Sequence, residues 1–193
     1  MPQTERPLRA DARRNRERIL TSAGDLFARR GNDVQMEEIA AHSGLGMGTL
    51  YRHFPSKRDL LMAVVRERFQ GMSQLALDAE RIDDPGHALE AVLRGYLEAA
   101  EGDAAFQLAI LGSQGLSWDG VEQQKVEFAD IVARIIDRAV AAGRLRADFS
   151  VADFPMLACG IMSTMYFQPG GNADWRRHLD LVLAGIRAPG TPG

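Results

Sequence analysis

Cysteine is nearly missing from this chain of 193 residues. Cys159 is the single one, so no disulfide within the chain can stabilise the fold, and a reducing compartment is expected. It lies in an apolar run over residues 154–165, where we expect it to pack as a small buried hydrophobic side chain. The sequence shows no second thiol and no neighbouring histidine, so neither a redox nor a metal role is expected for it.

Long apolar runs are missing as well. No window reaches the roughly 18 consecutive apolar residues that a membrane-spanning helix needs. Residues 1–18 are polar and rich in arginine, unlike a secretory signal peptide. The sequence therefore predicts a cytoplasmic protein with no membrane partner.

Motifs for catalysis are missing too. The sequence has no HExxH, no G-x-S-x-G, no phosphate-binding loop and no cysteine–histidine spacing for a metal. Its four histidines are scattered along the chain. We therefore predict that the protein is not an enzyme and has no catalytic residues, no metal site and no cofactor.

Charge is distributed unevenly, although the net charge is only −3. Residues 1–58 hold eleven Lys and Arg against seven Asp and Glu, and the remainder holds twelve against nineteen. A basic head on an acidic body suggests that the head meets a polyanion while the body stays away from it. The signal is modest by itself, because runs of charge often form only a solvated face.

Apolar residues recur at helical spacing nearly throughout, with no alternating strand and no internal repeat. The predicted fold class is therefore all-α, with about nine helices separated by turns that contain glycine or proline. The expected helices cover about residues 11–30, 34–43, 47–54, 56–81, 85–101, 103–114, 119–143, 151–168 and 172–187.

Residues 36–54 carry the most specific pattern. Two short amphipathic helices meet at residues 44–46 (Gly-Leu-Gly), where glycine backbone angles let the helices cross steeply. Helices of about eight residues do not stand alone, so we expect the first helix to pack beneath them through Ile19, Ala23 and Phe27. Such a three-helix unit presents its last helix to solvent, and the major groove of B-DNA is wide enough to admit it.

The last of these helices is expected to have two different faces. Leu50 and Phe54, four residues apart, should face the core. The outward positions suit DNA, because small or flexible residues let the backbone approach the bases and polar side chains reach phosphate oxygens. The small or flexible residues are Met47, Gly48 and Thr49, and the polar ones are Tyr51, His53 and Lys57. The alternatives are that Tyr51 is a packing aromatic and that His53 merely ends a helix.

A family resemblance covers about residues 13–65. It rests on the runs RERIL (16–20), LFARRG (26–31) and GLGMGTLYRHFPSKRDLL (44–61), which closely resemble the signature of the TetR family of transcriptional regulators. The resemblance implies two sets of DNA contacts. They are Tyr51, His53 and Lys57 on the DNA backbone, and Met47, Gly48, Thr49 and Arg52 in the groove.

The chain departs from this signature at two places. Many members carry Ser or Thr at the start of each short helix, where this chain has Val34-Gln35 and Leu45-Gly46. Helix capping and phosphate contacts at those two starts are therefore not carried over. The arginine-rich segment before Arg16 could track the adjacent minor groove or remain a mobile arm without DNA contact.

We expect the body to follow directly from the long helix that starts at Ser56, whose spacing to Asp59 is typical of a capping box. Residues 1–56 would form the DNA-binding head, 57–188 a helical-bundle domain for ligand binding and dimerisation, and 189–193 a disordered tail. The last two helices are apolar around much of their circumference, which favours a second subunit as their partner. The family resemblance implies the same homodimer, whose two recognition helices would lie about 34–36 Å apart on an inverted-repeat operator.

Methionine and aromatic side chains are scattered through the body and suggest a pocket for a small apolar or amphipathic ligand. Each of them could instead be ordinary core. The resemblance implies an inducer site in this region without identifying the ligand. The candidate lining residues are Met72, Phe106, Trp118, Phe128, Met162, Met165 and Tyr166.

These observations favour a homodimeric repressor that binds double-stranded operator DNA and is released by a small molecule. Ligand in the body would favour a spacing of the two heads that does not fit successive major grooves. An activator or a ligand-independent regulator of the same fold is the alternative. A third possibility is a structural protein whose helix-turn-helix only packs.

Overall fold

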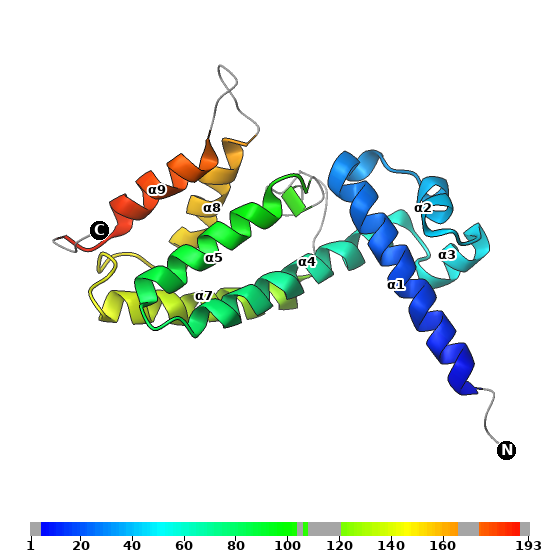
Figure 1. The fold of residues 1–193 in the computed structure, drawn as a ribbon, viewed down its shortest axis with the longest axis horizontal. Helices are drawn as coiled ribbons and strands as arrows, with labels where there is room; N and C mark the ends of the chain where they lie inside the picture. The colour runs from blue at the N-terminus through cyan, green and yellow to red at the C-terminus, as the bar shows by residue number, and fades with distance from the viewer. Residues whose placement is uncertain (1–4, 104–105, 108–120, 166–173, 190–193) are drawn as a thin grey trace. The chain divides into compact units, whose positions relative to one another are not determined.

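The computed structural model describes residues 5–103, 106–107, 121–165 and 174–189 of the chain. Within these ranges the fold comprises eight α-helices and one short 3₁₀ helix, with no strand among them (Figure 1). The predicted all-α class is therefore confirmed. No helix in the described ranges is long and apolar enough to cross a membrane.

The N-terminal elements are three helices and a turn, followed by one long helix. They are α1 (Glu5–Arg30), the 3₁₀ helix η1 (Gly31–Asp33), α2 (Met36–Ser43), α3 (Met47–His53) and α4 (Lys57–Glu80). The remaining elements form the larger part of the chain. They are α5 (Pro85–Ala100), α7 (Glu122–Ala141), α8 (Asp153–Ser163) and α9 (Trp175–Ile186).

Two helix ends differ clearly from the sequence-based expectation. α1 begins at Glu5 rather than near residue 11, and Pro7 falls in its first turn, where a missing N–H costs nothing. α8 ends at Ser163 rather than residue 168. The Thr164 and Met165 N–H groups donate to the carbonyls three residues before them, which is a tighter turn than that of an α-helix. The helix expected at residues 103–114 lies outside the described residues apart from 103, 106 and 107, of which 106–107 are helical.

The chain divides into two compact units, each of which is considered separately. One comprises the described residues up to Glu67 together with those between 102 and 107. The other comprises Arg68–Glu101 and the described residues from Val121 onward. The division falls within α4, so that helix contributes to both. The domain ranges 1–56, 57–188 and 189–193 remain a prediction.

The first unit is built on the apolar stripe of α1. Ile19, Ala23 and Phe27 are fully buried, and α1 packs against α2 through them, which confirms the expected packing of the first helix. From α2 and α3, Ile39 and Leu50 are equally buried. The short helices are therefore stabilised by this shared core rather than by their own hydrogen bonds.

The second unit is built around α5, which packs against α7, α8 and α9. An aromatic cluster lies at its centre: the Tyr96 ring stacks on Phe128, and Phe154 meets both edge-on, with all three centroid distances 5.7 Å. Burial raises the pKa of the Tyr96 hydroxyl. Tyr96 thus belongs to the core of this unit.

Two ion-pair clusters join helices of the second unit at their ends. Glu101, after α5, accepts hydrogen bonds from the Trp175 Nε1 (3.0 Å) and the Arg176 Nη2 (2.9 Å) of α9. Arg134 of α7 pairs with Glu80 at the end of α4 (2.7 Å). These contacts fix α9 against α5 and α7 against the C-terminal end of α4.

Candidate nucleic-acid interface

The candidate interface is the outer face of α3. Leu50 is fully buried and Phe54 is 4% exposed, which confirms that these two residues face the core. Tyr51 on the opposite side is 45% exposed, so it is not a packing aromatic. Gly48 and Arg52 are also exposed. The half-buried residues of the predicted set are Met47, Thr49, His53 and Lys57.

The face of α3 has exposed backbone at its start. A Cβ atom added to Gly48 would meet nothing within 4 Å, and the same holds for Gly46. Arg52 crosses this face, because its Nε donates to the Gly48 carbonyl (3.1 Å) and its Nη2 reaches the Thr49 hydroxyl (3.4 Å). A flat ligand surface can therefore approach the helix backbone beside a guanidinium group.

The turn between α2 and α3 depends on one glycine. Gly44 has φ +64°. Its N–H donates to the Ala41 carbonyl and the Leu45 N–H donates to the Ala40 carbonyl, which ends α2. Arg18 of α1 holds the same turn by donating to the Ser43 carbonyl (2.7 Å). Gly46 has φ −71°, which any residue adopts, so the expectation that both glycines supply special backbone angles is wrong for Gly46.

The start of α2 is capped without Ser or Thr. The Glu38 carboxylate accepts a hydrogen bond from the Gln35 N–H (2.9 Å) and another from the Arg30 guanidinium (2.8 Å). The hydrogen bond from Arg30 lowers the pKa of the Glu38 carboxyl. Capping at this start is therefore present, contrary to expectation, and the Gln35–Glu38 spacing of three was a signal for it.

The start of α4 has the serine cap of the predicted capping box, while the Asp59 carboxylate bonds the Ser56 hydroxyl rather than its backbone N–H. Ser56 Oγ accepts from the Asp59 N–H (3.1 Å) and donates to the Asp59 carboxylate (2.7 Å). The Lys57 ammonium donates to the carbonyl of Asn32 in η1. Lys57 is thereby held beside the 3₁₀ turn, with further N–H groups to offer.

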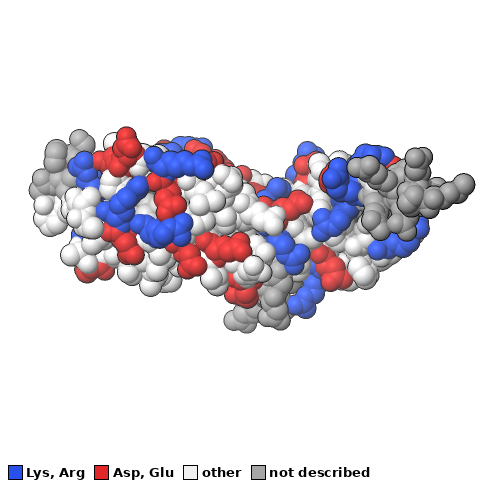
Figure 2. All heavy atoms as spheres, turned by 90° about the horizontal axis from the view of Figure 1, so that it is seen from below, with Lys and Arg blue, Asp and Glu red and all other residues white. Residues whose placement is uncertain are grey.

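The first unit presents mostly positive charge on the face drawn in Figure 2, where Lys and Arg predominate over the right-hand part of the molecule. Arg14, Arg18 and His42 line a shallow cavity of about 510 Å³ between α1 and α2. His42 is exposed. The same lining includes the Glu17 carboxylate, and α1 contributes two arginines to this side of the first unit.

The predicted ligand-lining residues fall in different places. Phe106 belongs to the first unit, whereas Met72, Phe128, Met162 and Met165 belong to the second. Met165 is half-buried and the others are buried, with Phe128 engaged in the aromatic cluster. Trp118 and Tyr166 lie outside the described residues. Their grouping into one pocket remains a prediction.

The last two helices pack against each other, and each exposes one large apolar side chain. Met156 of α8 is 75% exposed and Leu181 of α9 is 60% exposed. Cys159, expected to be buried, is only half-buried, and desolvation raises the pKa of its thiol. Large apolar side chains at such exposure are candidates for contact with a second subunit.

A three-helix unit that presents a short helix through a left-handed glycine turn defines a helix-turn-helix protein. Two family models match this chain. The family model described as "Bacterial regulatory proteins, tetR family" matches residues 19–64, and that described as "Transcriptional regulator SbtR-like, C-terminal domain" matches residues 84–188. The chain belongs to the TetR family of bacterial transcriptional regulators, which is a family of regulatory proteins and not of enzymes.

Individual relatives agree with this assignment. A TetR transcription regulatory protein from Mycobacterium vanbaalenii is 33% identical, with a TM-score of 0.69 over 94% of this chain and 100% of that one. The regulator SCO0520 from Streptomyces coelicolor is 30% identical, with a TM-score of 0.65 over 90% and 99%. The HTH-type transcriptional repressor BepR of Brucella suis is 31% identical over 137 residues, 69% of this chain. The match spans only 61% of the length of BepR.

Proposed function

We propose that the protein is a homodimeric transcriptional repressor that binds an inverted-repeat operator and releases it when a small apolar or amphipathic molecule binds the second unit. The observation that carries the proposal is the exposed backbone at Gly48 on α3, with Arg52 lying beside it. A regulator that acts on bacterial DNA works in the cytoplasm.

The groove-facing contacts would come from the start and middle of α3. Gly48 lets the helix backbone approach the bases, while Met47 and Thr49 meet base edges or methyl groups. Arg52 presents two parallel N–H donors of the kind that pair with guanine. These four residues would determine the operator sequence.

The backbone contacts would come from the flanks of α3. Tyr51 is exposed and offers a hydroxyl donor to a phosphate oxygen, and His53 and Lys57 follow on the side of α4. Contacts of this kind position the protein without reading sequence. They also make affinity depend strongly on salt.

Dimerisation would use the outer face of α8 and α9, where Met156 and Leu181 are exposed in the single chain. A two-fold pairing through one such face brings two copies of α3 to successive half-sites. α4 contributes residues to both units, so a ligand that changes the arrangement of its C-terminal half can change the spacing of the heads. Operator position relative to the promoter would distinguish this repressor from an activator.

The decisive experiment uses duplexes selected from a random library by the wild-type protein, with affinity measured by fluorescence anisotropy. Wild-type affinity should fall about 10³–10⁵-fold between 50 and 200 mM salt if six to ten phosphates are contacted. Lys57→Ala should weaken binding to all selected duplexes alike and reduce the salt slope by about one. Failure to select any duplex, or a flat response to salt, would refute the proposal.

Gly48→Ala separates DNA contact from folding. The new methyl group has no neighbour in the protein, so the melting temperature should hold or rise, because alanine favours the helix by about 1 kcal/mol. Operator affinity should nevertheless fall, because the methyl group stands between α3 and the bases. Gly71→Ala on α4, also without a neighbour within 4 Å, is the matched control and should leave affinity unchanged.

A further inference from the structure

The shallow cavity between α1 and α2, which we call the α1–α2 groove, is lined only by polar and charged residues, from Arg14 to Ser22 on α1 and at His42 and Ser43 on α2. Such a lining does not suit the apolar or amphipathic molecule expected in the second unit. It suits an anion that accepts several hydrogen bonds.

One positive charge in the groove has no carboxylate partner. Arg14 and Glu17 each pair with a neighbouring residue of α1, so their charges are already compensated. Among the described residues, the Arg18 guanidinium donates only to the Ser43 carbonyl (2.7 Å) and pairs with no carboxylate. Arg18 therefore keeps its charge and further N–H groups for a ligand.

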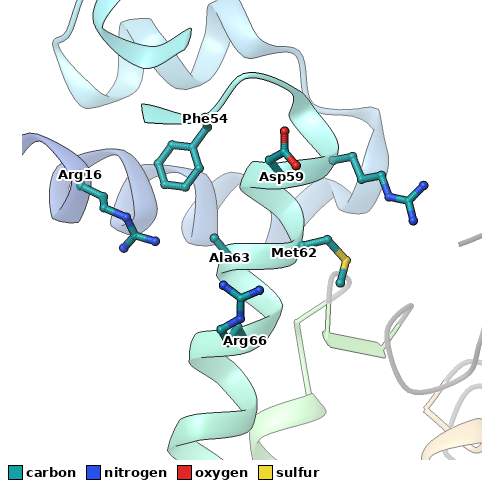
Figure 3. A pocket seen from close by; sticks show the side chains of 7 residues that line it. Arg16, Phe54, Asp59, Met62, Ala63 and Arg66 are labelled. Carbon is teal, nitrogen blue, oxygen red and sulfur yellow. The ribbon is translucent and has the colours of Figure 1, made fainter. Parts of the chain in front are cut away.

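Arg16, two residues before Arg18, serves a different part of the unit. Two residues span just over half a helical turn, so the two side chains leave α1 on different sides. The Arg16 guanidinium lies over the Phe54 ring, 5.2 Å from its centroid, and lines a second cavity together with Arg66 of α4 (Figure 3). Arg18 is instead directed toward α2 and the turn that precedes α3.

Three uncharged donors line the groove beside Arg18. Ser22 is only 7% exposed, and its hydroxyl has no hydrogen-bond partner in the described part of the chain. Thr21 and His42 are exposed, and each offers a further donor. The groove can therefore donate several hydrogen bonds to one group of oxygen atoms.

The groove also borders the start of α3. The Arg18 guanidinium lies 3.1 Å from the position that a Cβ atom on Gly44 would take, so it lies against the turn into α3. α3 has seven residues and is about 10 Å long, close to the roughly 12 Å width of the major groove. In the groove, its two ends therefore lie near the backbones of different strands. His53 and Lys57 follow the end of α3, and Arg18 lies beside its start.

We propose that the α1–α2 groove binds a backbone phosphate of the operator, on the strand opposite to the one contacted from the end of α3. This inference rests on the proposed function and adds a second phosphate site to each half-site. The remaining Arg18 N–H groups donate to the phosphate oxygens. The hydroxyls of Thr21 and Ser22 and the imidazole of His42 donate to the same phosphate and fix α3 in register.

The test uses the full chain and duplexes selected by the wild type, in which methylphosphonate linkages neutralise one phosphate at a time. Linkages on both strands of a half-site should weaken wild-type binding about tenfold. Arg18→Gln should weaken binding to the unmodified duplex about tenfold, lower the salt slope by about one and abolish the effect of the linkages on one strand. Lys57→Ala should abolish the effect on the other strand.

Arg18 also holds the turn before α3, so further variants separate phosphate contact from folding. Arg18→Lys keeps the charge and should keep the wild-type salt slope. Thr21→Val removes one exposed hydroxyl and should weaken binding about fivefold at an unchanged melting temperature. Arg29→Gln, exposed on α1 outside the groove, is the control and should change neither affinity nor slope.

Two results would overturn this inference and leave the proposed function standing. Arg18→Gln and Thr21→Val could both remain sensitive to every linkage that affects the wild type, while Lys57→Ala loses its own set. Alternatively, Arg18→Gln and Arg18→Lys could weaken binding equally without any change in salt slope, which would show that Arg18 only holds the turn. A protein that selects no duplex would overturn both the inference and the proposed function.

Discussion

The Leu75 side chain of α4 occupies the space that a methyl group on Gly95 of α5 would need. An added Cβ atom at Gly95 would lie closer to the Leu75 Cδ1 than two carbon atoms can approach, and 3.2 Å from the Cδ2 and Cγ atoms, so the Leu75 side chain would have to shift. The Cδ1 atom is the far end of a flexible side chain and Leu75 is half-buried, so a change of its rotamer can make room for a methyl group.

Gly95→Ala should consequently gain less stability than the same substitution at a glycine in open space. Moving the Leu75 side chain out of its preferred rotamer costs about 0.5–1.5 kcal/mol, which offsets the roughly 1 kcal/mol that alanine gains over glycine in a helix. The free energy of unfolding from chemical denaturation measures the effect. Gly71→Ala on α4 is the matched control and should stabilise slightly, since its methyl group meets nothing. Equal effects of the two substitutions would contradict the close approach.

Gly44→Ala should loosen the helix-turn-helix. Gly44 has φ +64°, and an added Cβ atom would lie 3.1 Å from the Arg18 guanidinium that holds the turn. The left-handed conformation costs an L-residue about 1–2 kcal/mol, and we expect a loss of that size in unfolding free energy, with weaker DNA binding. Gly46→Ala, at φ −71° with open space around it, should cost less, because any residue adopts that backbone angle. A neutral Gly44→Ala substitution would show that the turn tolerates a side chain.

Acid should weaken the attachment of α9 to α5. Hydrogen bonds from Arg176, and then from Trp175, lower the pKa of the Glu101 carboxyl below its usual value of 4.5. The stabilisation is therefore fully present above that usual value and is lost as pH falls through the lowered value in the folded state. Urea denaturation between about pH 6 and pH 2 should show this loss in the wild type.

Glu101→Gln should flatten part of that acid dependence, because the amide does not titrate. Glu127→Gln on α7 is the control, since the Glu127 carboxylate accepts a hydrogen bond from Gln123 of its own helix (3.1 Å) and joins no two helices. An unchanged pH profile in Glu101→Gln would show that the ion pair with Arg176 contributes nothing to stability.

Met156→Glu and Leu181→Glu should each prevent dimerisation. Both side chains are exposed on α8 and α9 of the single chain, so a carboxylate costs the monomer little but would be buried without a partner in a dimer interface. Sedimentation velocity should show a dimer for the wild type and a monomer for either variant. Val126→Glu on α7, at 57% exposure, is the control and should remain dimeric. A monomeric wild type would contradict the proposed two-fold dimer.

Several features were accessible from sequence because they depend on neighbours along the chain. The apolar stripe of α1, the inward pair Leu50 and Phe54, and the cap formed by Ser56 and Asp59 all follow from spacings of three or four residues on a helix. The family resemblance at residues 44–61 followed in the same way, from an unbroken run.

Other features required contacts between residues far apart in the sequence. The meeting of Tyr96, Phe128 and Phe154, and the pairing of Glu101 with Arg176, leave no local pattern in the chain. The close approach of Leu75 to Gly95 likewise joins two different helices.

The amino-acid sequence by itself determined the all-helical class, the helix-turn-helix and its family, because periodicity and capping are local and the signature run is contiguous. Only the tertiary structure decided that Gly44 and not Gly46 needs its special backbone angle, and that Arg16, Phe54 and Arg66 line one cavity. Backbone angles at a turn and the lining of a cavity depend on how helices cross, and that geometry is set by packing over the whole core rather than by any one segment.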